Sequence, residues 1–249
     1  MNLSGKIGLV TGGTRGIGAA TAIGLAKAGA DVALVGRYWD AEATATQDLI
    51  RSMGRRCEVV LANCGVPGEN TRCVRETEEK LGSVDILVHA AGGPVNGGLM
   101  DLTEAAWTSA FDVHEHAVFH LCRAVIPAMR AKKEGAIILI SSTAGIRGVI
   151  TNVAYQVAKG ALPQMARALA REFAEDNIRV NCAAPGVVRT AFHATMTETQ
   201  RRLNLDHRIP LHREGTPEQV ADLILMLIQN DYITGETMTI DGGLTMRIA

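Results

Sequence analysis

The stretch "TGGTRGIG", Thr11 to Gly18, follows an apolar run and precedes a segment with helical periodicity. Gly12 permits a tight turn, Gly16 allows backbone to approach a phosphate, and Gly18 allows the helix to pack against the strand. The N-terminus of that helix offers free N–H groups and a partial positive charge to a pyrophosphate. The alternative is an ordinary turn, but this strand-to-helix context predicts a dinucleotide site.

Short apolar runs alternate with helical segments along the whole chain. The runs are "KIGLV", "DVALVG", "CEVVLA", "VDILVHA", "GAIILIS", "IRVNCAA" and "TMTID", and the helical segments include 16–28, 41–53, 103–131, 152–176 and 217–229. Strands that are apolar on both faces predict a parallel sheet covered by helices on both sides. We expect residues 1–249 to form a single-domain α/β Rossmann fold, with a doubly wound sheet of about seven strands and ligands beyond their carboxyl ends.

Composition narrows the class of protein. The 249 residues are 47% hydrophobic and 20% charged, which fits a folded chain with a large core. Lys plus Arg (25) nearly balances Asp plus Glu (26), which disfavours nucleic acid or an anionic membrane as partner. No apolar run approaches the ~20 residues that span a bilayer, and the start shows no signal peptide. The odd number of cysteines, without a C-x-x-C, suggests reduced thiols in a cytoplasmic protein.

The second strand ends in "VALVGRY". A carboxylate at its tip would bind the ribose hydroxyls of NAD and repel a 2′-phosphate. This chain has Gly36 there, followed by Arg37, and it carries Arg15 in the glycine turn. Two guanidinium groups without an acid suit a 2′-phosphate, so NADP(H) is favoured over NAD(H). The alternative is that both arginines are solvated surface residues.

The segment "NVAYQVAKGALPQMARALAREFAED" predicts a long helix, capped by Thr151 or Asn152. Its inward stripe contains Tyr155, Lys159, Leu162, Ala166, Leu169 and Phe173. A buried lysine is costly without a partner, so its place on this stripe indicates a cleft. A cation four residues away should lower the pKa of Tyr155, although an incidental exposed pair is the alternative. Ser141 and Ser142 end the fifth strand.

Taken together, these motifs closely resemble the classical short-chain dehydrogenase/reductase family over essentially the whole chain. The resemblance rests on "TGGTRGIG", Ser142, "YQVAK" (155–159), "PGVVRT" (185–190) and "TGETMTIDGG" (234–243). It implies that Tyr155 exchanges a proton with the substrate oxygen and that Ser142 orients that oxygen. It also implies that Lys159 lowers the Tyr155 pKa and holds the nicotinamide ribose. Family members are commonly homotetramers, less often homodimers, with the two long helices at one interface.

The resemblance extends to the residues that would bind the cofactor. They are Gly12, Thr14, Arg15, Gly16, Ile17, Gly18, Arg37, Asn63, Ala90, Ala91, Gly92, Tyr155, Lys159, Pro185, Gly186, Val188 and Thr190. Three departures stand out. Asn63 replaces a frequent Asp, "HAAG" (89–92) replaces "NNAG", and His114 replaces an Asn that kinks its helix and holds a water. We expect His114 to serve as a substitute proton relay, or else to be a satisfied core histidine.

The stretch "FDVHEHAVFH" (111–120) resembles a metal cluster at first sight. With Phe111 at 0°, an ideal helix puts His114 at about 300°, within the apolar stripe. His116 lies at about 140° and His120 at about 180°, on the opposite side. The three histidines therefore cannot share one ion, and no metal is expected. In the catalytic helix, Pro163 cannot donate to the carbonyl of Lys159, which predicts a local kink.

Residues 191–215 should form a lid over a small-molecule substrate, and they mix Phe192, Met196 and Leu203 with His193, Arg208 and His212. A medium-sized, mainly apolar ketone or alcohol suits this mixture, and the resemblance then implies an NADP(H)-dependent carbonyl reductase or alcohol dehydrogenase acting on a ketone or secondary alcohol. The alternatives within the family are a 3-oxoacyl-(acyl-carrier-protein) reductase and a sugar or polyol dehydrogenase. For the first, the basic "RAKK" (130–133) could dock an acidic carrier, whereas Glu175 and Asp176 would oppose it. From another class, a non-catalytic dinucleotide sensor is the rival.

Overall fold

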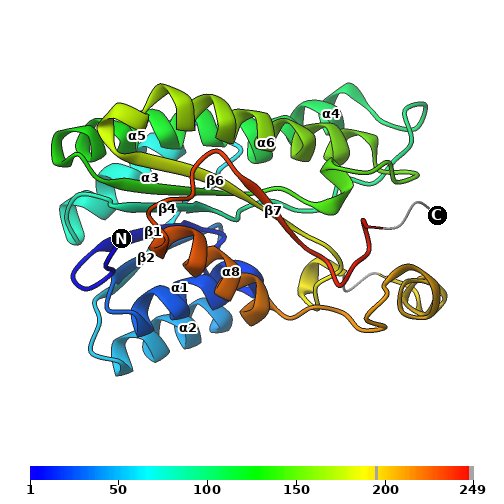
Figure 1. The fold of residues 1–249 in the computed structure, drawn as a ribbon, viewed down its shortest axis with the longest axis horizontal. Helices are drawn as coiled ribbons and strands as arrows, with labels where there is room; N and C mark the ends of the chain where they lie inside the picture. Colours follow the sequence, from blue (N-terminus) through cyan, green and yellow to red (C-terminus); the bar gives the residue numbers. More distant parts are fainter. Residues whose placement is uncertain (194–195, 247–249) are drawn as a thin grey trace.

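The computed structural model describes residues 1–193 and 196–246, and it contains one parallel sheet of seven strands (Figure 1). Their order is β3-β2-β1-β4-β5-β6-β7, and each neighbouring pair is parallel. The strands are β1 (Ile7–Thr11), β2 (Asp31–Gly36), β3 (Cys57–Leu61), β4 (Ile86–His89), β5 (Gly135–Ile140), β6 (Ile178–Pro185) and β7 (Thr237–Ile240). The predicted doubly wound sheet is confirmed.

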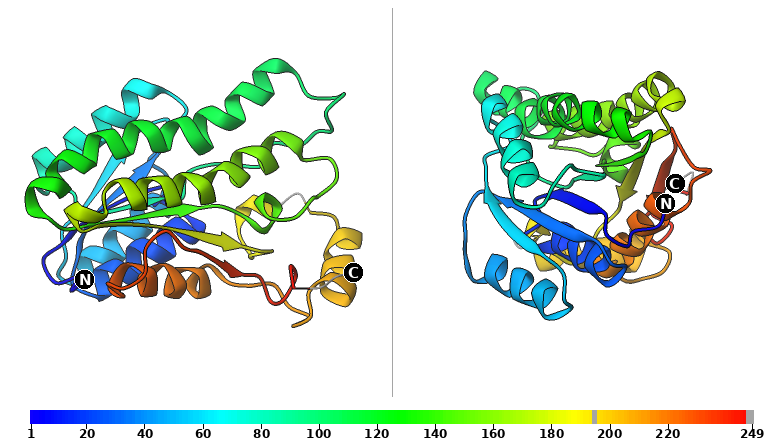
Figure 2. Two further views of the ribbon diagram at one scale, coloured as in Figure 1. Left: turned by 45° about the horizontal axis from the view of Figure 1, so that its top comes forward. Right: turned by 90° about the vertical axis from the view of Figure 1, so that its left-hand side faces the viewer.

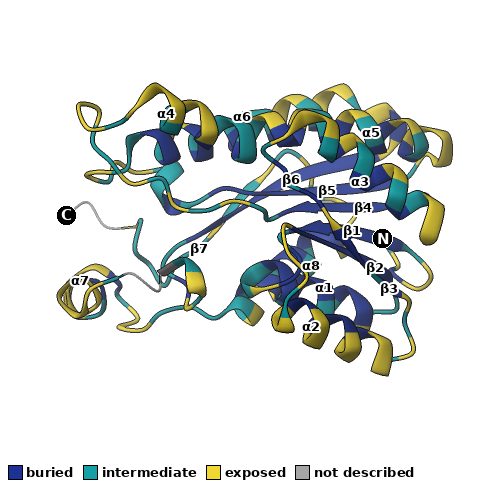
Figure 3. Ribbon diagram, turned by 180° about the vertical axis from the view of Figure 1, so that it is seen from behind, coloured by how far each residue is buried: buried dark blue, intermediate teal, exposed yellow. Residues whose placement is uncertain are grey.

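Helices cover both faces of the sheet (Figures 1 and 2). On one face lie α1 (Gly16–Lys27), α2 (Ala41–Ser52) and α8 (Pro217–Gln229), and on the other lie α3 (Pro67–Lys80), α5 (Ala117–Lys132) and α6 (Val153–Glu172). Each layer of helices buries its own apolar cluster against the sheet. Figure 3 shows the strands buried between exposed outer helix faces, which is why the strand sequences are apolar throughout.

The strand order reverses between β1 and β4, and this reversal positions the site. Thr11, the last residue of β1, is paired with His89, the last residue of β4. The chain leaves β1 toward α1 and leaves β4 toward the opposite layer, so the two connections diverge and leave a crevice at the carboxyl ends. The glycine turn and the "HAAG" segment therefore lie side by side. The close approach of Gly12 to Ala90 confirms this placement.

Two helical segments differ from the predicted ones. The helix α3 was missed, because its charged sequence "PGENTRCVRETEEK" carries few apolar residues. The helix predicted over 103–131 is three segments, α4 (Glu104–Phe111), the π-helix η1 (Asp112–His116) and α5. In η1 the chain is wound more widely, and the Ala117 N–H bonds the carbonyl of Asp112, five residues back. The pattern of apolar residues in the sequence does not reveal this change of helical winding.

The helix α6 passes through Pro163 as a single element and ends at Glu172, after which residues 174–176 form a short 3₁₀ turn. Asn152 precedes its first turn, as predicted, but the Asn152 side chain makes no capping hydrogen bond. Its Oδ1 is buried without a partner among the described residues. The helix is therefore held in place by packing and by contacts along its length rather than by its N-terminal cap.

The predicted lid lies beyond the carboxyl ends of the strands (Figures 1 and 3). It contains η4 (Ala191–His193), α7 (Glu198–Arg202) and η5 (Leu203–Arg208), and residues 194 and 195 lie outside the described part. The Leu211 N–H donates to Gly242 O at 3.2 Å, which ties the lid to the C-terminal segment. Within the described residues, no helix is both long and apolar enough to span a membrane.

Candidate active site

The glycine turn is packed as a phosphate cradle requires. A Cβ on Gly12 would lie 2.8 Å from the Ala90 carbonyl oxygen, and one on Gly18 would lie 2.1 Å from the Gly12 carbonyl oxygen. Gly12 also has a φ of +66°, a conformation that side chains disfavour. Since α1 begins at Gly16 and Arg15 makes no side-chain cap, the first N–H groups of the helix remain available to an anion. The residues present therefore fit a dinucleotide pyrophosphate.

Around the expected adenosine ribose, the tip of β2 is crowded at Gly36. A Cβ on Gly36 would lie 2.7 Å from Thr14 Cγ2, so any side chain there would require Thr14 to shift. Arg37 is exposed, with its Cζ 5.6 Å from the centre of the Tyr38 ring. Asn63 follows β3, and its Oδ1 accepts from the Gly65 N–H at 3.1 Å.

The expectation that this region lacks an acid is wrong. Arg15 forms ion pairs with Asp40 and with Glu42, the latter at 3.2 Å. Asp40 also caps α2 by accepting from the Ala43 N–H at 3.0 Å. The Ala43 N–H, followed by the charge of Arg15, lowers the pKa of Asp40. The two acids are the N-cap residue of α2 and a residue of its first turn, a few residues beyond the tip of β2.

Ser142, Tyr155 and Lys159 come together at the carboxyl edge of β5. Tyr155 and Lys159 are 7% and 5% exposed, which confirms that this stripe of α6 faces inward. The Lys159 Nζ lies 5.7 Å from the centre of the Tyr155 ring. It donates to the Ile140 carbonyl oxygen at 2.6 Å. The Ser142 Oγ accepts from the Ala144 N–H at 3.1 Å, and the Ser142 side chain also bonds Tyr155.

The pKa of Tyr155 differs from the one expected. Burial raises it to about 12, and the hydrogen bond with Ser142 only partly opposes this effect. The phenolate form has lost its hydration in this buried place. The ammonium of Lys159 hydrogen-bonds the Ile140 carbonyl. Burial also lowers the pKa of Lys159 to about 8, so the ammonium remains mainly protonated at pH 7.

His114 lies in η1 and is 1% exposed, directly beside Tyr155. Its ring meets the Tyr155 ring edge-on, with 5.4 Å between centres. The Nε2 is 3.0 Å from the Gly93 carbonyl oxygen, so Nε2 carries the proton and donates it. The Nδ1 is then a buried acceptor without a partner among the described residues. Burial, followed by the charge of Lys159, lowers the pKa of His114 to about 2.

His89 is a site residue that the sequence analysis missed. Its Nε2 donates to the Val113 carbonyl oxygen at 3.0 Å, and its Nδ1 accepts from the Thr11 hydroxyl at 2.9 Å. The same hydroxyl oxygen accepts from the Ala91 N–H at 3.2 Å. His89 therefore ties β1, β4 and the π-helix together, and burial lowers its pKa to about 4. The signal in the sequence was a histidine at the end of an otherwise apolar strand.

The same cluster of side chains explains why residue 92 is a glycine. A Cβ there would lie 2.0 Å from His114 Cε1, and its φ of +144° also disfavours a side chain. The outer histidines lie elsewhere: the His116 Nδ1 is 2.9 Å from Asp112 Oδ1, and His120 contacts the Phe119 ring. Among the described residues, no three His, Cys, Asp or Glu side chains are grouped as a metal site requires.

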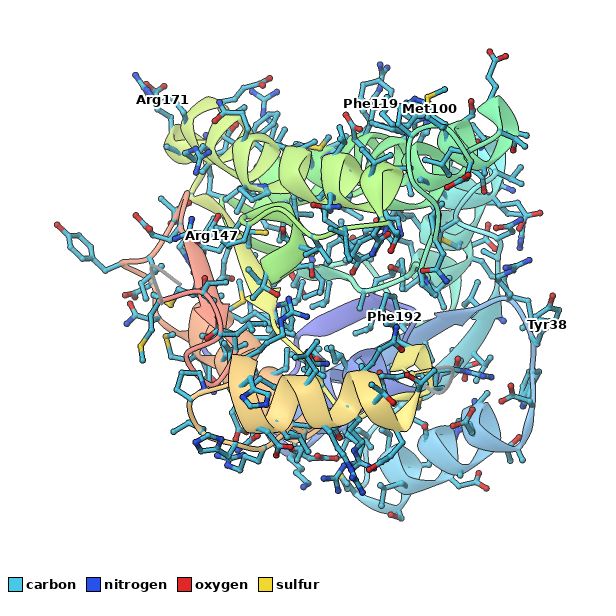
Figure 4. All side chains as sticks on the ribbon, turned by 90° about the vertical axis from the view of Figure 1, so that its right-hand side faces the viewer. Tyr38, Met100, Phe119, Arg147, Arg171 and Phe192 are labelled. Atoms are coloured by element: carbon cyan, nitrogen blue, oxygen red, sulfur yellow. The ribbon has the colours of Figure 1, made fainter. Side chains whose placement is uncertain are left out.

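The segment that follows β6 passes first the glycine turn and then Tyr155. The Thr190 methyl carbon would lie 3.4 Å from a Cβ on Gly16. Farther on, Phe192 points from the lid toward α6 (Figure 4), with its ring centre 5.7 Å from that of Tyr155. At the start of the segment, Pro185 ends β6 and the Gly186 N–H bonds the Ile240 carbonyl. Val188 is buried and pairs with Gly215.

Comparison with known proteins gives consistent results. The family described as Enoyl-(Acyl carrier protein) reductase matches residues 12–245. A 3-oxoacyl-(acyl-carrier-protein) reductase of Chlamydia muridarum is 34% identical over 97% of this chain and 98% of its own length. Dehydrogenase/reductase SDR family member 4 of Bos taurus is 36% identical over 97% of this chain and 88% of its own.

Solved structures are equally similar to this chain. The L-sorbose reductase of Gluconobacter frateurii, complexed with NADPH and L-sorbose, has a TM-score of 0.91 at 29% identity, with all of both chains covered. A double mutant of a Serratia marcescens short-chain dehydrogenase/reductase has a TM-score of 0.91 at 30% identity, covering 98% of this chain and all of its own.

The two buried histidines predict a loss of stability in acid. Both stay neutral in the folded protein, with pKa values of about 4 and about 2, whereas the unfolded chain takes up protons below about pH 6.5. Stability is therefore fully present above that pH and is lost as the pH falls toward 4. Each histidine contributes about 1.4 kcal/mol per pH unit to this loss.

Denaturant unfolding of the wild type and of His114→Asn at pH 6.5, 5.5 and 4.5 measures this effect. The substitution removes one of the two buried histidines and leaves all other titratable groups in place. The variant should lose about 1.4 kcal/mol less per pH unit than the wild type. Equal slopes for the two proteins would contradict the assignment of His114 as a buried neutral imidazole.

Proposed function

The chain belongs to the classical short-chain dehydrogenase/reductase family, and we propose that it is an NADP(H)-dependent carbonyl reductase or alcohol dehydrogenase. The observation that carries the proposal is the cluster of Ser142 with the buried Tyr155 and Lys159, beside a glycine turn that fits a pyrophosphate. In our proposal residues 1–249 act as one catalytic domain. Bound NADP(H) supplies or accepts the hydride, and the chain's own residues manage the proton and the substrate oxygen.

The proton chemistry follows from the environment of Tyr155. In reduction, a hydride added to the carbonyl carbon leaves charge on the oxygen, and the neutral phenol of Tyr155 donates its proton there. A phenol whose pKa is held high by burial is a suitable acid for a strongly basic alkoxide. Ser142 donates a hydrogen bond to the same oxygen and orients it. The Lys159 ammonium lies close enough to stabilise the phenolate that results, and it holds the nicotinamide ribose.

The substitution Tyr155→Phe tests the proposal most simply. It removes the proton donor while keeping the ring that packs against His114 and Phe192. We expect turnover with ketones to fall by about 100-fold or more, because general acid catalysis contributes that much, while NADPH binding persists. NADPH consumption across a panel of ketones, diketones, ketoses and acyl thioesters measures it.

Two outcomes would contradict the proposal. Wild-type turnover by Tyr155→Phe would remove Tyr155 from the mechanism. Tight NADPH binding by the wild type without turnover of any carbonyl would favour the dinucleotide sensor instead.

The preference for NADP(H) rests on Arg15 and Arg37, with Gly36 in place of a carboxylate at the tip of β2. The L-sorbose reductase of similar fold was solved with NADPH. Asp40 and Glu42 weaken the preference, because they already occupy the Arg15 guanidinium and lie where a 2′-phosphate would bring further negative charge. NAD(H) therefore remains the alternative cofactor.

The substitution Asp40→Asn tests how far the acid beside Arg15 weakens the preference for NADP(H). The amide keeps an oxygen that caps α2 at Ala43 but loses the negative charge beside Arg15. We expect NADPH affinity to rise about three- to ten-fold, with little change for NADH. Fluorescence titration of both dinucleotides checks this, with Glu58→Gln as a control that removes a distant acid paired with Arg51. No change in the NADPH/NADH ratio, or a strong preference of the wild type for NADH, would contradict the two-arginine assignment.

His114 is proposed as the substitute for the family's relay asparagine. With a pKa of about 2 it does not become an imidazolium near neutral pH, so a relay through it must use the neutral ring. Its free acceptor, Nδ1, can receive a hydrogen bond from a water at the active site. Proton passage then requires release from Nε2, which is bound to the Gly93 carbonyl.

The variants His114→Ala and His114→Asn test this role. We expect His114→Ala to lower kcat about ten-fold and to shift the pH profile, since proton supply to the site is impaired. His114→Asn should recover much of the loss, because the amide again offers a donor and an acceptor. Unchanged turnover and an unchanged pH profile in His114→Ala would show instead a satisfied core histidine.

One specific observation bears on the choice among the alternative substrates. The "RAKK" segment, which could have docked an acidic carrier protein, is engaged in internal ion pairs. Arg130 and Lys133 both pair with Asp176, at 2.7 and 2.6 Å, and Lys132 pairs with Asp85 at 2.7 Å. This favours a free ketone over a carrier-bound thioester, although the similarity to 3-oxoacyl-(acyl-carrier-protein) reductases keeps that alternative, and L-sorbose reductase keeps the sugar or polyol alternative.

We extend the proposal to assembly and location. A groove of about 910 Å³ lies between α5 and α6, lined by apolar residues such as Phe119, Met165 and Leu169. It suits the family's packing of these helices in a homotetramer or homodimer, which sedimentation velocity would distinguish. All five cysteines, Cys57, Cys64, Cys73, Cys122 and Cys182, are free and buried, which favours a reducing cytoplasm.

A further inference from the structure

The backbone of Lys159 lacks the hydrogen bond that a helix normally provides. In α6 its carbonyl should accept from the N–H four residues ahead, but that residue is Pro163, which has none. The Ser141 Oγ–H donates to this carbonyl instead, at 2.7 Å, in a buried position. Ser141 is itself 3% exposed and is fixed to β6 by its N–H, which bonds the Ala183 carbonyl at 2.8 Å.

The same peptide is enclosed from a second side. A Cβ on Gly145 would lie 2.7 Å from the Lys159 carbonyl carbon and 2.8 Å from the Gly160 nitrogen. The turn after Ser142 therefore presses directly on the helix backbone at Lys159. The carbonyl of Lys159 is thus held in a buried hydrogen bond, with the turn packed against its peptide.

Three consecutive residues thus hold three parts of the catalytic helix. The Ile140 carbonyl accepts from the Lys159 ammonium, the Ser141 hydroxyl holds the Lys159 carbonyl, and the Ser142 side chain bonds Tyr155. The middle contact is the one that compensates for a proline, and it sets where the Cα of Lys159 lies relative to β5. The position of the ammonium depends on that Cα.

We propose that Ser141 is a positioning residue, whose hydroxyl replaces the hydrogen bond that Pro163 removes and so fixes Lys159 against Tyr155. The inference rests on the proposed function, because it assigns Ser141 to the alignment of the same catalytic pair. It also predicts a coupling: Ser141 is needed only because residue 163 is a proline.

The experiment is a double-mutant cycle of Ser141→Ala and Pro163→Ala, with Ser141→Thr as the conservative variant. Ser141→Ala leaves the Lys159 carbonyl buried and unpaired, and we expect kcat to fall about ten-fold with a shifted basic limb of the pH profile. Pro163→Ala alone should keep wild-type kcat. In the double variant the new N–H at position 163 bonds the Lys159 carbonyl, so kcat and the pH profile should return to within about two-fold of Pro163→Ala.

Thr77→Ala is the matched control. Thr77 is fully buried in α3, and its hydroxyl donates to the Cys73 carbonyl at 2.8 Å, a bond of the same kind away from the site. It should lower the melting temperature without moving the pH profile. Ser141→Thr, which keeps the hydroxyl, should retain most of the activity.

Three outcomes would overturn the inference. They are wild-type kcat and pH profile in Ser141→Ala, a loss that Pro163→Ala does not restore in a folded double variant, and failure of both Ser141→Ala and the double variant to fold. If Ser141→Ala alone fails to fold and the double variant is active, the compensation is supported. Absence of turnover in the wild type would refute the proposed function separately, and the melting temperatures of the cycle would still report the coupling.

Discussion

The structure depends on one constraint, the burial of the Lys159 ammonium at the carboxyl edge of the sheet. Removing such a charge from water costs several kcal/mol unless polar partners surround it. The Ile140 carbonyl, the last of β5, supplies a direct partner. The same charge adds to the burial that keeps His114 and His89 neutral. The lysine thereby helps to keep the neighbouring imidazoles unprotonated, which in our proposal leaves Tyr155 as the proton donor beside it.

Two departures from the family pattern belong together. His89 stands at the end of β4 and His114 in the π-helix, and each imidazole donates to a backbone carbonyl, of Val113 and of Gly93. The first bond holds the π-helix to the sheet, and the second holds its histidine to the segment after β4. Gly92 is small because the His114 ring occupies the place of its side chain.

The sequence predicted the architecture because apolar strands and glycine turns are local patterns. It also placed Ser142, Tyr155 and Lys159 together, since the carboxyl end of one strand and the inward stripe of the next helix must meet. It missed α3, whose charged surface hides its periodicity, and the π-helix, which changes winding without changing composition. It could not show Asp40 beside Arg15 or Ser141 on the Lys159 carbonyl, because both contacts join segments distant in sequence.

The central claim of the proposed mechanism is that the Lys159 ammonium stabilises the phenolate that Tyr155 becomes when it gives up its proton. The chain has three tyrosines, so replacing Tyr38 and Tyr232 by Phe leaves Tyr155 as the only one. Its pKa can then be measured by NMR of ¹³C-labelled tyrosine at saturating NADPH, with Lys159 intact and in Lys159→Met. The account predicts a pKa at least about one unit lower with the lysine present, as a neighbouring cation produces. Equal values in the two proteins would contradict it.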